Sequence, residues 1–89
     1  MRKTVIGVMG GSVADEATAA AARELGRLIA ENGWVLVSGG RPTGVMQASV
    51  TGAREAGGLT VGVLFDDDHE LAAEGLDIVI PTGMGAARN

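Results

Sequence analysis

The sequence predicts an α/β domain with a Rossmann-like parallel sheet. Short apolar runs rich in β-branched residues alternate with longer segments of helical periodicity, and pairs of glycines directly follow the first two apolar runs. The apolar runs also lack the alternation of polar and apolar residues that marks a sheet with one wet face. Strands that alternate with helices in this way form βαβ units, here with a sheet of about four strands.

The expected strands are short and almost entirely apolar. They lie at residues 4–9, 34–38, 60–64 and 77–80. The acidic segment 65–75 separates the last two strands and is expected to be a loop with one short helical turn. The tail that begins at Pro81 is expected to be irregular.

Two main helices are expected between the first three strands. The first runs from Asp15 or Glu16 to Ala30, because apolar residues recur there at helical spacing and Ser12 or Asp15 can cap its start. The second runs from Val45 to Ala56 and ends before a pair of glycines.

Connection rules then predict the topology. Right-handed crossovers give the first three strands the order 3-2-1 and place both helices on one face. We expect the fourth strand to pair beside the first, which gives the order 3-2-1-4 and a ligand-binding crevice between strands one and four. The apolar strands require a cover on the second face as well, yet no helix follows Ile80. We therefore expect a truncated domain or a homo-oligomer that covers the bare sheet face.

Composition excludes several classes of protein. A chain of 89 residues has room for one small domain. The net charge of −4 and the scattered positions of the one lysine and six arginines argue against a nucleic-acid interface. The absence of cysteine excludes disulfides and thiolate metal sites, and no apolar stretch is long enough to span a membrane. These features predict a cytoplasmic protein.

Two glycine-rich loops are the candidate ligand-binding site. Both are expected at the carboxyl ends of adjacent strands, where backbone N–H groups can converge on a phosphate. A tight turn before a capped helix uses the same residue types, so each loop alone is ambiguous. The predicted binding residues are Gly10, Gly11, Ser12, Ser38, Gly39, Gly40, Arg41, Thr43 and Gly44.

Charged residues near these loops allow two readings. Arg41 and Arg88 can neutralise a phosphate, although solvent exposure explains Arg41 equally well. His69, the single histidine, lies in an acidic run, but the spacing matches no known metal site and we expect no bound metal.

Three segments resemble a known family: IGVMGGS, VSGGRPTGVMQASVTGAREAGGLTVGVL and IPTGMGAARN. They resemble the LOG-like (SLOG) Rossmann superfamily, formerly called putative lysine decarboxylases. This superfamily includes the cytokinin riboside monophosphate phosphoribohydrolases and the molybdenum cofactor carrier proteins. The resemblance is closest to its carrier-like and uncharacterised branch. It covers nearly the whole chain, and it implies that residues 1–89 are the N-terminal portion of one such domain.

The resemblance implies an AMP-like nucleotide or the molybdenum cofactor as ligand at the glycine loops. In the hydrolase branch an arginine after the fourth strand assists catalysis, and Arg88 resembles it. The glutamate of the PGG-x-GT-x-x-E motif, its catalytic partner, is not found in these residues. Three functions stay open: non-catalytic binding of a nucleotide or phosphate ligand, hydrolysis of a nucleoside monophosphate, and a self-associating structural half-domain.

Overall fold

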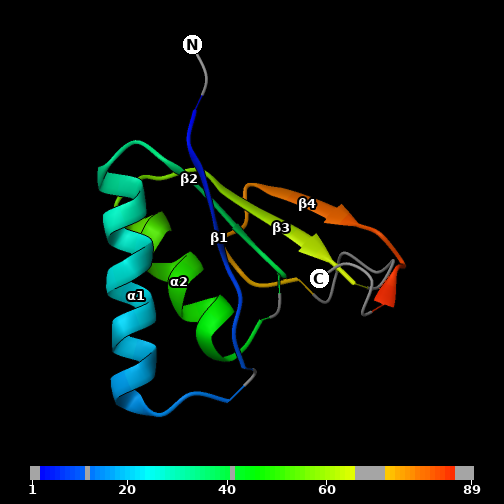
Figure 1. The fold of residues 1–89 in the computed structure, drawn as a ribbon, viewed down its shortest axis with the longest axis horizontal. Helices are drawn as coiled ribbons and strands as arrows, with labels where there is room; N and C mark the ends of the chain where they lie inside the picture. The colour runs from blue at the N-terminus through cyan, green and yellow to red at the C-terminus, as the bar shows by residue number, and fades with distance from the viewer. Residues whose placement is uncertain (1–2, 12, 41, 66–71, 86–89) are drawn as a thin grey trace.

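A computed structural model describes residues 3–11, 13–40, 42–65 and 72–85 of the chain. The strands are β1 (Val5–Val8), β2 (Val35–Ser38), β3 (Thr60–Leu64) and β4 (Ile78–Pro81). The helices are α1 (Glu16–Glu31) and α2 (Gly44–Glu55). Both helices lie side by side on one face of the sheet, as predicted (Figure 1). In the part of the chain described here, no helix has the length and apolar character needed to cross a membrane.

The helix boundaries follow the signals in the sequence. Asp15 caps α1, where its carboxylate accepts a hydrogen bond of 2.7 Å from the Thr18 N–H. After α1, Gly33 adopts a φ of +74°, and after α2, Gly57 adopts a φ of +77°. Left-handed glycines of this kind let the chain leave a helix and turn back toward the sheet.

The sheet is fully parallel, with the order β1-β2-β3-β4. The predicted adjacency of the first three strands is confirmed. The predicted place of the fourth strand is wrong, because β4 pairs with β3 through Val61↔Ile78 and Val63↔Ile80 and does not lie beside β1. The order 3-2-1-4 and the crevice between strands one and four are therefore also wrong.

A buried polar cluster at the start of β3 explains where β4 lies. Thr60 is fully buried, and its hydroxyl is 2.8 Å from the Gly75 carbonyl oxygen. The carboxylate of Asp77 accepts the Thr60 N–H at 2.9 Å, and the Asp77 N–H donates to the Thr60 carbonyl at 3.0 Å. These bonds hold the residue before β4 against the first residue of β3, so the strand that follows pairs with β3.

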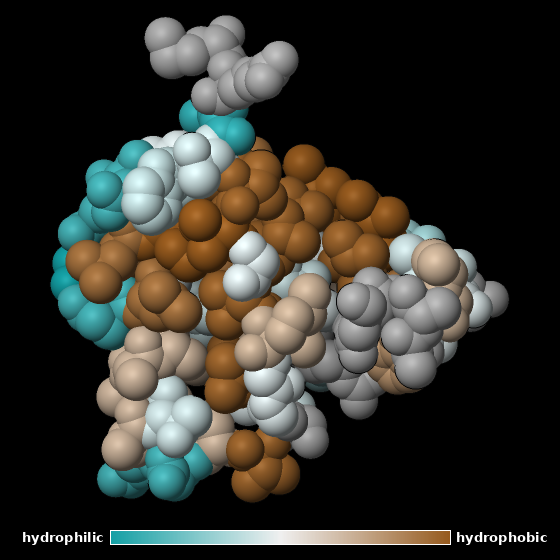
Figure 2. Space-filling view, viewed as in Figure 1, coloured by the Kyte–Doolittle hydropathy of each residue, from teal (hydrophilic) through white to brown (hydrophobic). Residues whose placement is uncertain are grey.

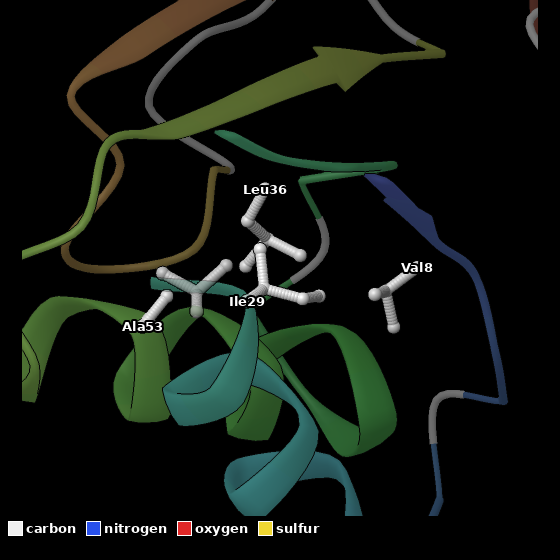
Figure 3. Packing of buried hydrophobic residues seen from close by; sticks show 5 residues of the cluster. Val8, Ile29, Leu36 and Ala53 are labelled. Carbon is white, nitrogen blue, oxygen red and sulfur yellow. The ribbon is translucent and has the colours of Figure 1, made fainter. Parts of the chain in front are cut away.

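The core lies between the helices and the sheet. It is centred on Val8, Ile29, Leu36, Val50 and Ala53. Figure 3 labels four of these side chains, Val8, Ile29, Leu36 and Ala53, which lie between the strands and the helices. The two helices touch through glycine. A Cβ atom on Gly26 of α1 would lie 1.9 Å from the Ser49 carbonyl oxygen, and one on Gly52 of α2 would lie 1.9 Å from the Arg23 carbonyl oxygen. No side chain fits at either crossing point.

No described helix covers the opposite face of the sheet, which we call the bare face. Strand alternation and register place eight residues on it: Val5, Gly7, Val35, Val37, Val61, Val63, Ile78 and Ile80. Only Val35 of these is buried. Figure 2 shows hydrophobic residues gathered over the strands and hydrophilic residues along α1. The sequence predicted this exposed apolar face.

Candidate functional site

Both predicted glycine loops lie at the carboxyl edge of the sheet. β1 and β2 are parallel, and Val8 pairs with Ser38, so the residues that follow these two strands leave the sheet side by side. Gly10-Gly11 follows β1, and Gly39-Gly40 follows β2. This is the juxtaposition expected from the sequence, and it brings two bends without side chains to one place.

The first loop touches the start of α2. A Cβ atom on Gly10 would lie 2.6 Å from Cβ of Val45, so the close approach of the helix requires glycine there. The Gly11 carbonyl oxygen accepts a hydrogen bond of 3.2 Å from the Val45 N–H. Gly11 itself is exposed, and an added Cβ would make only ordinary contacts, the nearest at 3.5 Å from the Val13 carbonyl oxygen. No acceptor for the Gly11 N–H is found among the described residues.

The second loop is held mainly by its own chain. Gly40 has a φ of +74°, and a Cβ atom there would lie 2.4 Å from Cδ2 of Leu64. Its N–H donates to the buried Ser38 hydroxyl at 3.0 Å, and its carbonyl accepts the Ala73 N–H at 2.7 Å. Ser38 and Gly40 therefore stabilise the turn, in addition to any contact that they make with a ligand.

The two helices differ in whether an acidic side chain lies at the first turn. The carboxylate of Asp15 occupies the start of α1, and Glu16 adds a second acid. Hydrogen bonding from the Thr18 N–H, followed by the Thr18 side chain, lowers the pKa of Asp15, so its charge is retained in the fold. A second anion is thereby disfavoured at α1.

The start of α2 carries no such acid. Its cap residue Thr43 is exposed and makes no side-chain capping hydrogen bond, and the first turn contains no acidic residue. Gly44 has a φ of +65° and opens the helix. No acidic side chain of the first turn therefore opposes the positive end of the α2 dipole, which lies beside the loop that contains Gly11, and the Gly11 carbonyl oxygen accepts the Val45 N–H of that turn.

A further glycine turn at the same edge was not among the predicted site residues. The Thr82 hydroxyl donates to the Leu64 carbonyl at 2.6 Å, and the Gly85 N–H donates to the Phe65 carbonyl at 2.8 Å. Gly83 and Gly85 have φ values of +66° and +60°. The two glycines at 83 and 85, which follow β4 by two and four residues, were the signal in the sequence for this turn.

Four residues singled out from the sequence lie outside the described part of the chain: Ser12, Arg41, His69 and Arg88. In the described portions of the loops at residues 9–11, 39–40, 42–44 and 82–85, no side chain is charged. Among described residues no group of three or more potential metal ligands is found either. The described part of this edge therefore offers backbone N–H groups and the exposed Thr43 hydroxyl, which suit an anion.

Open grooves are also found away from this edge. One of about 600 Å³ lies between the outer surfaces of α1 and α2, where Arg23, Arg27 and Glu55 line it together with alanines. The Arg23 and Glu55 side chains form an ion pair at 2.5 Å across it, and both are more than half exposed. Such exposed pairs add little stability and do not form a buried polar site.

Comparison with known proteins identifies the family. The pattern of the SLOG cluster4 family matches residues 3–89. An uncharacterised protein of Archaeoglobus fulgidus is 46% identical over 89 residues, which are 100% of this chain and 58% of that protein.

Solved structures of two similar proteins have the same fold. The molybdenum cofactor binding protein of the phototrophic bacterium Rippkaea orientalis is 46% identical, with a TM-score of 0.94 over 99% of this chain and 55% of its own. The Moco carrier protein of Chlamydomonas reinhardtii is 43% identical, with a TM-score of 0.84 over 97% of this chain and 53% of its own. This chain thus spans little more than half the length of these relatives, and it belongs to the SLOG cluster4 family of LOG-like proteins.

Proposed function

We propose that this chain binds a small phosphate-bearing ligand of the molybdenum-cofactor type at the carboxyl edge of its sheet. The observation that carries the proposal is the contrast between the two helices. The start of α1 is already occupied by the Asp15 carboxylate, whereas the start of α2 has no acid and lies against the Gly10-Gly11 loop. A phosphate there would gain the helix dipole and backbone N–H donors together.

The residues at this edge fit the phosphate part of such a ligand. Gly11 leaves room for an oxygen to approach its backbone, because it carries no side chain and the nearest atom to an added Cβ, the Val13 carbonyl oxygen, would lie at 3.5 Å. Thr43 offers an exposed hydroxyl without a capping role. We propose three further partners for the phosphate: Ser12, Arg41 and Arg88. The molybdenum cofactor would contribute its phosphate to this contact.

The ligand class follows from the relatives. Two similar proteins of known structure are described as a molybdenum cofactor binding protein and a Moco carrier protein. An AMP-like nucleotide presents the same phosphate chemistry and is the competing ligand. Hydrolysis of a nucleoside monophosphate would need an acid or base at the reacting bond. The described edge loops contain no charged side chain to provide one, so we favour binding without catalysis.

Titration calorimetry tests the proposal with three ligands: molybdopterin, AMP and inorganic phosphate. We expect saturable binding of molybdopterin that Gly11→Asp weakens by at least about 100-fold, because a carboxylate beside the phosphate repels it. The fold should tolerate this variant, since an added Cβ meets only ordinary contacts. Val13→Asp is the matched control. It adds the same charge to the same loop at a side chain that is 91% exposed, and should bind as the wild type does.

Two results would contradict the proposal. Equal affinity of the wild type and Gly11→Asp would place the ligand elsewhere, and an absence of saturable binding by any of the three ligands would remove the binding function. Release of free adenine from AMP above the buffer rate would instead favour the hydrolase.

A further inference from the structure

Residues 73–77, which we call the strap, connect the second glycine loop with the start of β3. At one end of the strap the Ala73 N–H donates to the Gly40 carbonyl oxygen at 2.7 Å. At the other end the Gly75 carbonyl oxygen accepts the hydroxyl of the buried Thr60 at 2.8 Å. Between these ends the strap runs beside α2 (Figure 1). The position of Gly40 at the carboxyl edge is therefore tied to a segment that follows β3 in the chain.

The side chain of Gln47 holds the middle of the strap. Its Nε2 donates to the Glu74 carbonyl oxygen at 3.1 Å, and its Oε1 accepts the Glu74 N–H at 3.1 Å. The carboxamide thus bonds both backbone groups of one residue, as a neighbouring strand would. Its Nε2 also donates to the Thr51 hydroxyl at 3.2 Å. The contact with Glu74 needs a donor and an acceptor side by side, which a carboxamide provides and an apolar side chain of this length does not.

Gln47 also belongs to the first turn of α2, beside the proposed ligand site. Its backbone N–H donates to the Thr43 carbonyl oxygen at 3.5 Å. Its side chain holds Glu74, and the preceding residue of the strap, Ala73, holds Gly40. These contacts connect the start of α2 with the turn of the second glycine loop, and Gln47 is common to the helix and to the contact with the strap.

We propose that Gln47 is a positioning residue for the ligand site. By fixing the strap, it fixes the Gly40 turn beside the start of α2 before the ligand binds, which lowers the cost of ordering the site on binding. The carboxamide itself does not contact the ligand, because its two N–H groups are engaged by Glu74 and Thr51 and its oxygen would repel a phosphate. This inference rests on the proposed function and names a residue that acts on that site from outside it.

Gln47→Met tests the proposal by calorimetry and stopped-flow binding of molybdopterin. Methionine resembles glutamine in length and in helix propensity, but it has no N–H to donate and is a weak acceptor. We expect the dissociation constant to rise by at least about fivefold, because a smaller fraction of the molecules holds the site in its binding form. The loss should lie in the association rate constant, with the dissociation rate constant unchanged.

Thr51→Val is the matched control. Thr51 lies one turn further along the same face of α2. Its substitution removes one hydrogen bond of the Gln47 amide and leaves both bonds to Glu74 in place. We expect this variant to have the wild-type association and dissociation rate constants.

Hydrogen exchange without ligand separates positioning from a general loss of stability. The Ala73 N–H should exchange faster in Gln47→Met than in the wild type, because the strap that carries its bond to Gly40 is released. The Leu36 N–H, which donates to the Leu59 carbonyl oxygen at 3.1 Å, should exchange at the wild-type rate. A purely structural role would accelerate both exchange rates and leave the association rate constant of the folded protein unchanged, and that result would reject the proposal.

Two other results would overturn the positioning role, and a third bears on the proposed function as well. If Gly11→Asp weakens binding while Gln47→Met binds at the wild-type rate, the ligand site stands and the role of Gln47 is refuted. If the loss in Gln47→Met lies in faster dissociation alone, Gln47 contacts the ligand directly and does not position the site. A wild type that binds none of molybdopterin, AMP and inorganic phosphate would remove the proposed function and this inference with it.

Discussion

Replacing Gly26 by alanine should destabilise the protein, although alanine is the better helix former. A Cβ atom at this position would lie 1.9 Å from the Ser49 carbonyl oxygen and 2.8 Å from its carbon. Ordinary contacts of a Cβ atom begin near 3.4 Å, so α1 and α2 must separate by about 1.5 Å at this crossing. The displacement would loosen Ile29 and Val50, which pack in the same layer.

The expected magnitude is a balance of two effects. Overpacking of a well-packed core costs about 1–3 kcal/mol, and the rigid backbone of α2 places this site at the upper end of that range. Alanine returns about 0.5–1 kcal/mol of helix propensity. We expect a net loss of about 2 kcal/mol, which is a large share of the few kcal/mol available to a domain of this size.

Urea unfolding followed by circular dichroism and by the single tryptophan, Trp34, measures this loss. Gly11→Ala is the control, because its Cβ meets only ordinary contacts, and it should be close to neutral. Gly52→Ala should resemble Gly26→Ala, since it meets the Arg23 carbonyl oxygen at the same distance. The double variant should cost less than the two losses added, because the helices separate only once. A Gly26→Ala protein as stable as the wild type would refute the close helix crossing.

Two other predictions concern the elements that frame the site. Thr60→Val should destabilise the protein by about 1–3 kcal/mol, because it leaves the Gly75 carbonyl without its hydroxyl partner. Hydrogen exchange should show faster exchange of the backbone N–H groups in β4. Unchanged protection of β4 would contradict this role of Thr60. The folded-state pKa of the Asp15 carboxyl lies below its ordinary value of 3.8, chiefly because the Thr18 N–H donates a hydrogen bond to it. The carboxylate therefore contributes its full stability above pH 3.8, and this contribution is lost as the pH falls through the folded-state pKa. Asp15→Asn keeps a capping acceptor that does not titrate, and its stability relative to the wild type should therefore rise in acid; a constant difference across that pH range would show that Asp15 does not titrate with folding.

Local patterns in the sequence were sufficient to predict most of the fold. Asp15 and Gly33 mark the ends of α1, and the β-branched runs mark the strands to within one or two residues. The position of β4 could not be predicted in the same way. It depends on hydrogen bonds between Thr60 and Asp77, which lie far apart in sequence and have no local signature. The general tendency of such folds to place the fourth strand beside the first therefore gave the wrong position for β4.

The candidate site shows a similar division. That Gly10-Gly11 and Gly39-Gly40 share one edge followed from parallel pairing of two consecutive strands. Which helix could receive an anion did not follow, because the sequence allowed either Ser12 or Asp15 to cap α1. In the structure the Asp15 carboxylate caps α1. The first glycine loop contacts the start of α2 instead, through the hydrogen bond from the Val45 N–H to the Gly11 carbonyl oxygen.

The glycines themselves separate into those the fold requires and those it leaves free. Gly10 is required by its contact with Cβ of Val45, and Gly40 is required by its φ of +74°, so the presence of these glycines alone says nothing about a ligand. Gly11 is different, because a Cβ atom there would meet only ordinary contacts and because it lies beside the start of α2, which has no side-chain cap. A position that tolerates a side chain, beside a helix start whose first turn carries no acid, gives the most direct test of whether this edge binds phosphate. Its substitution changes the site while leaving the packing that forms the site in place.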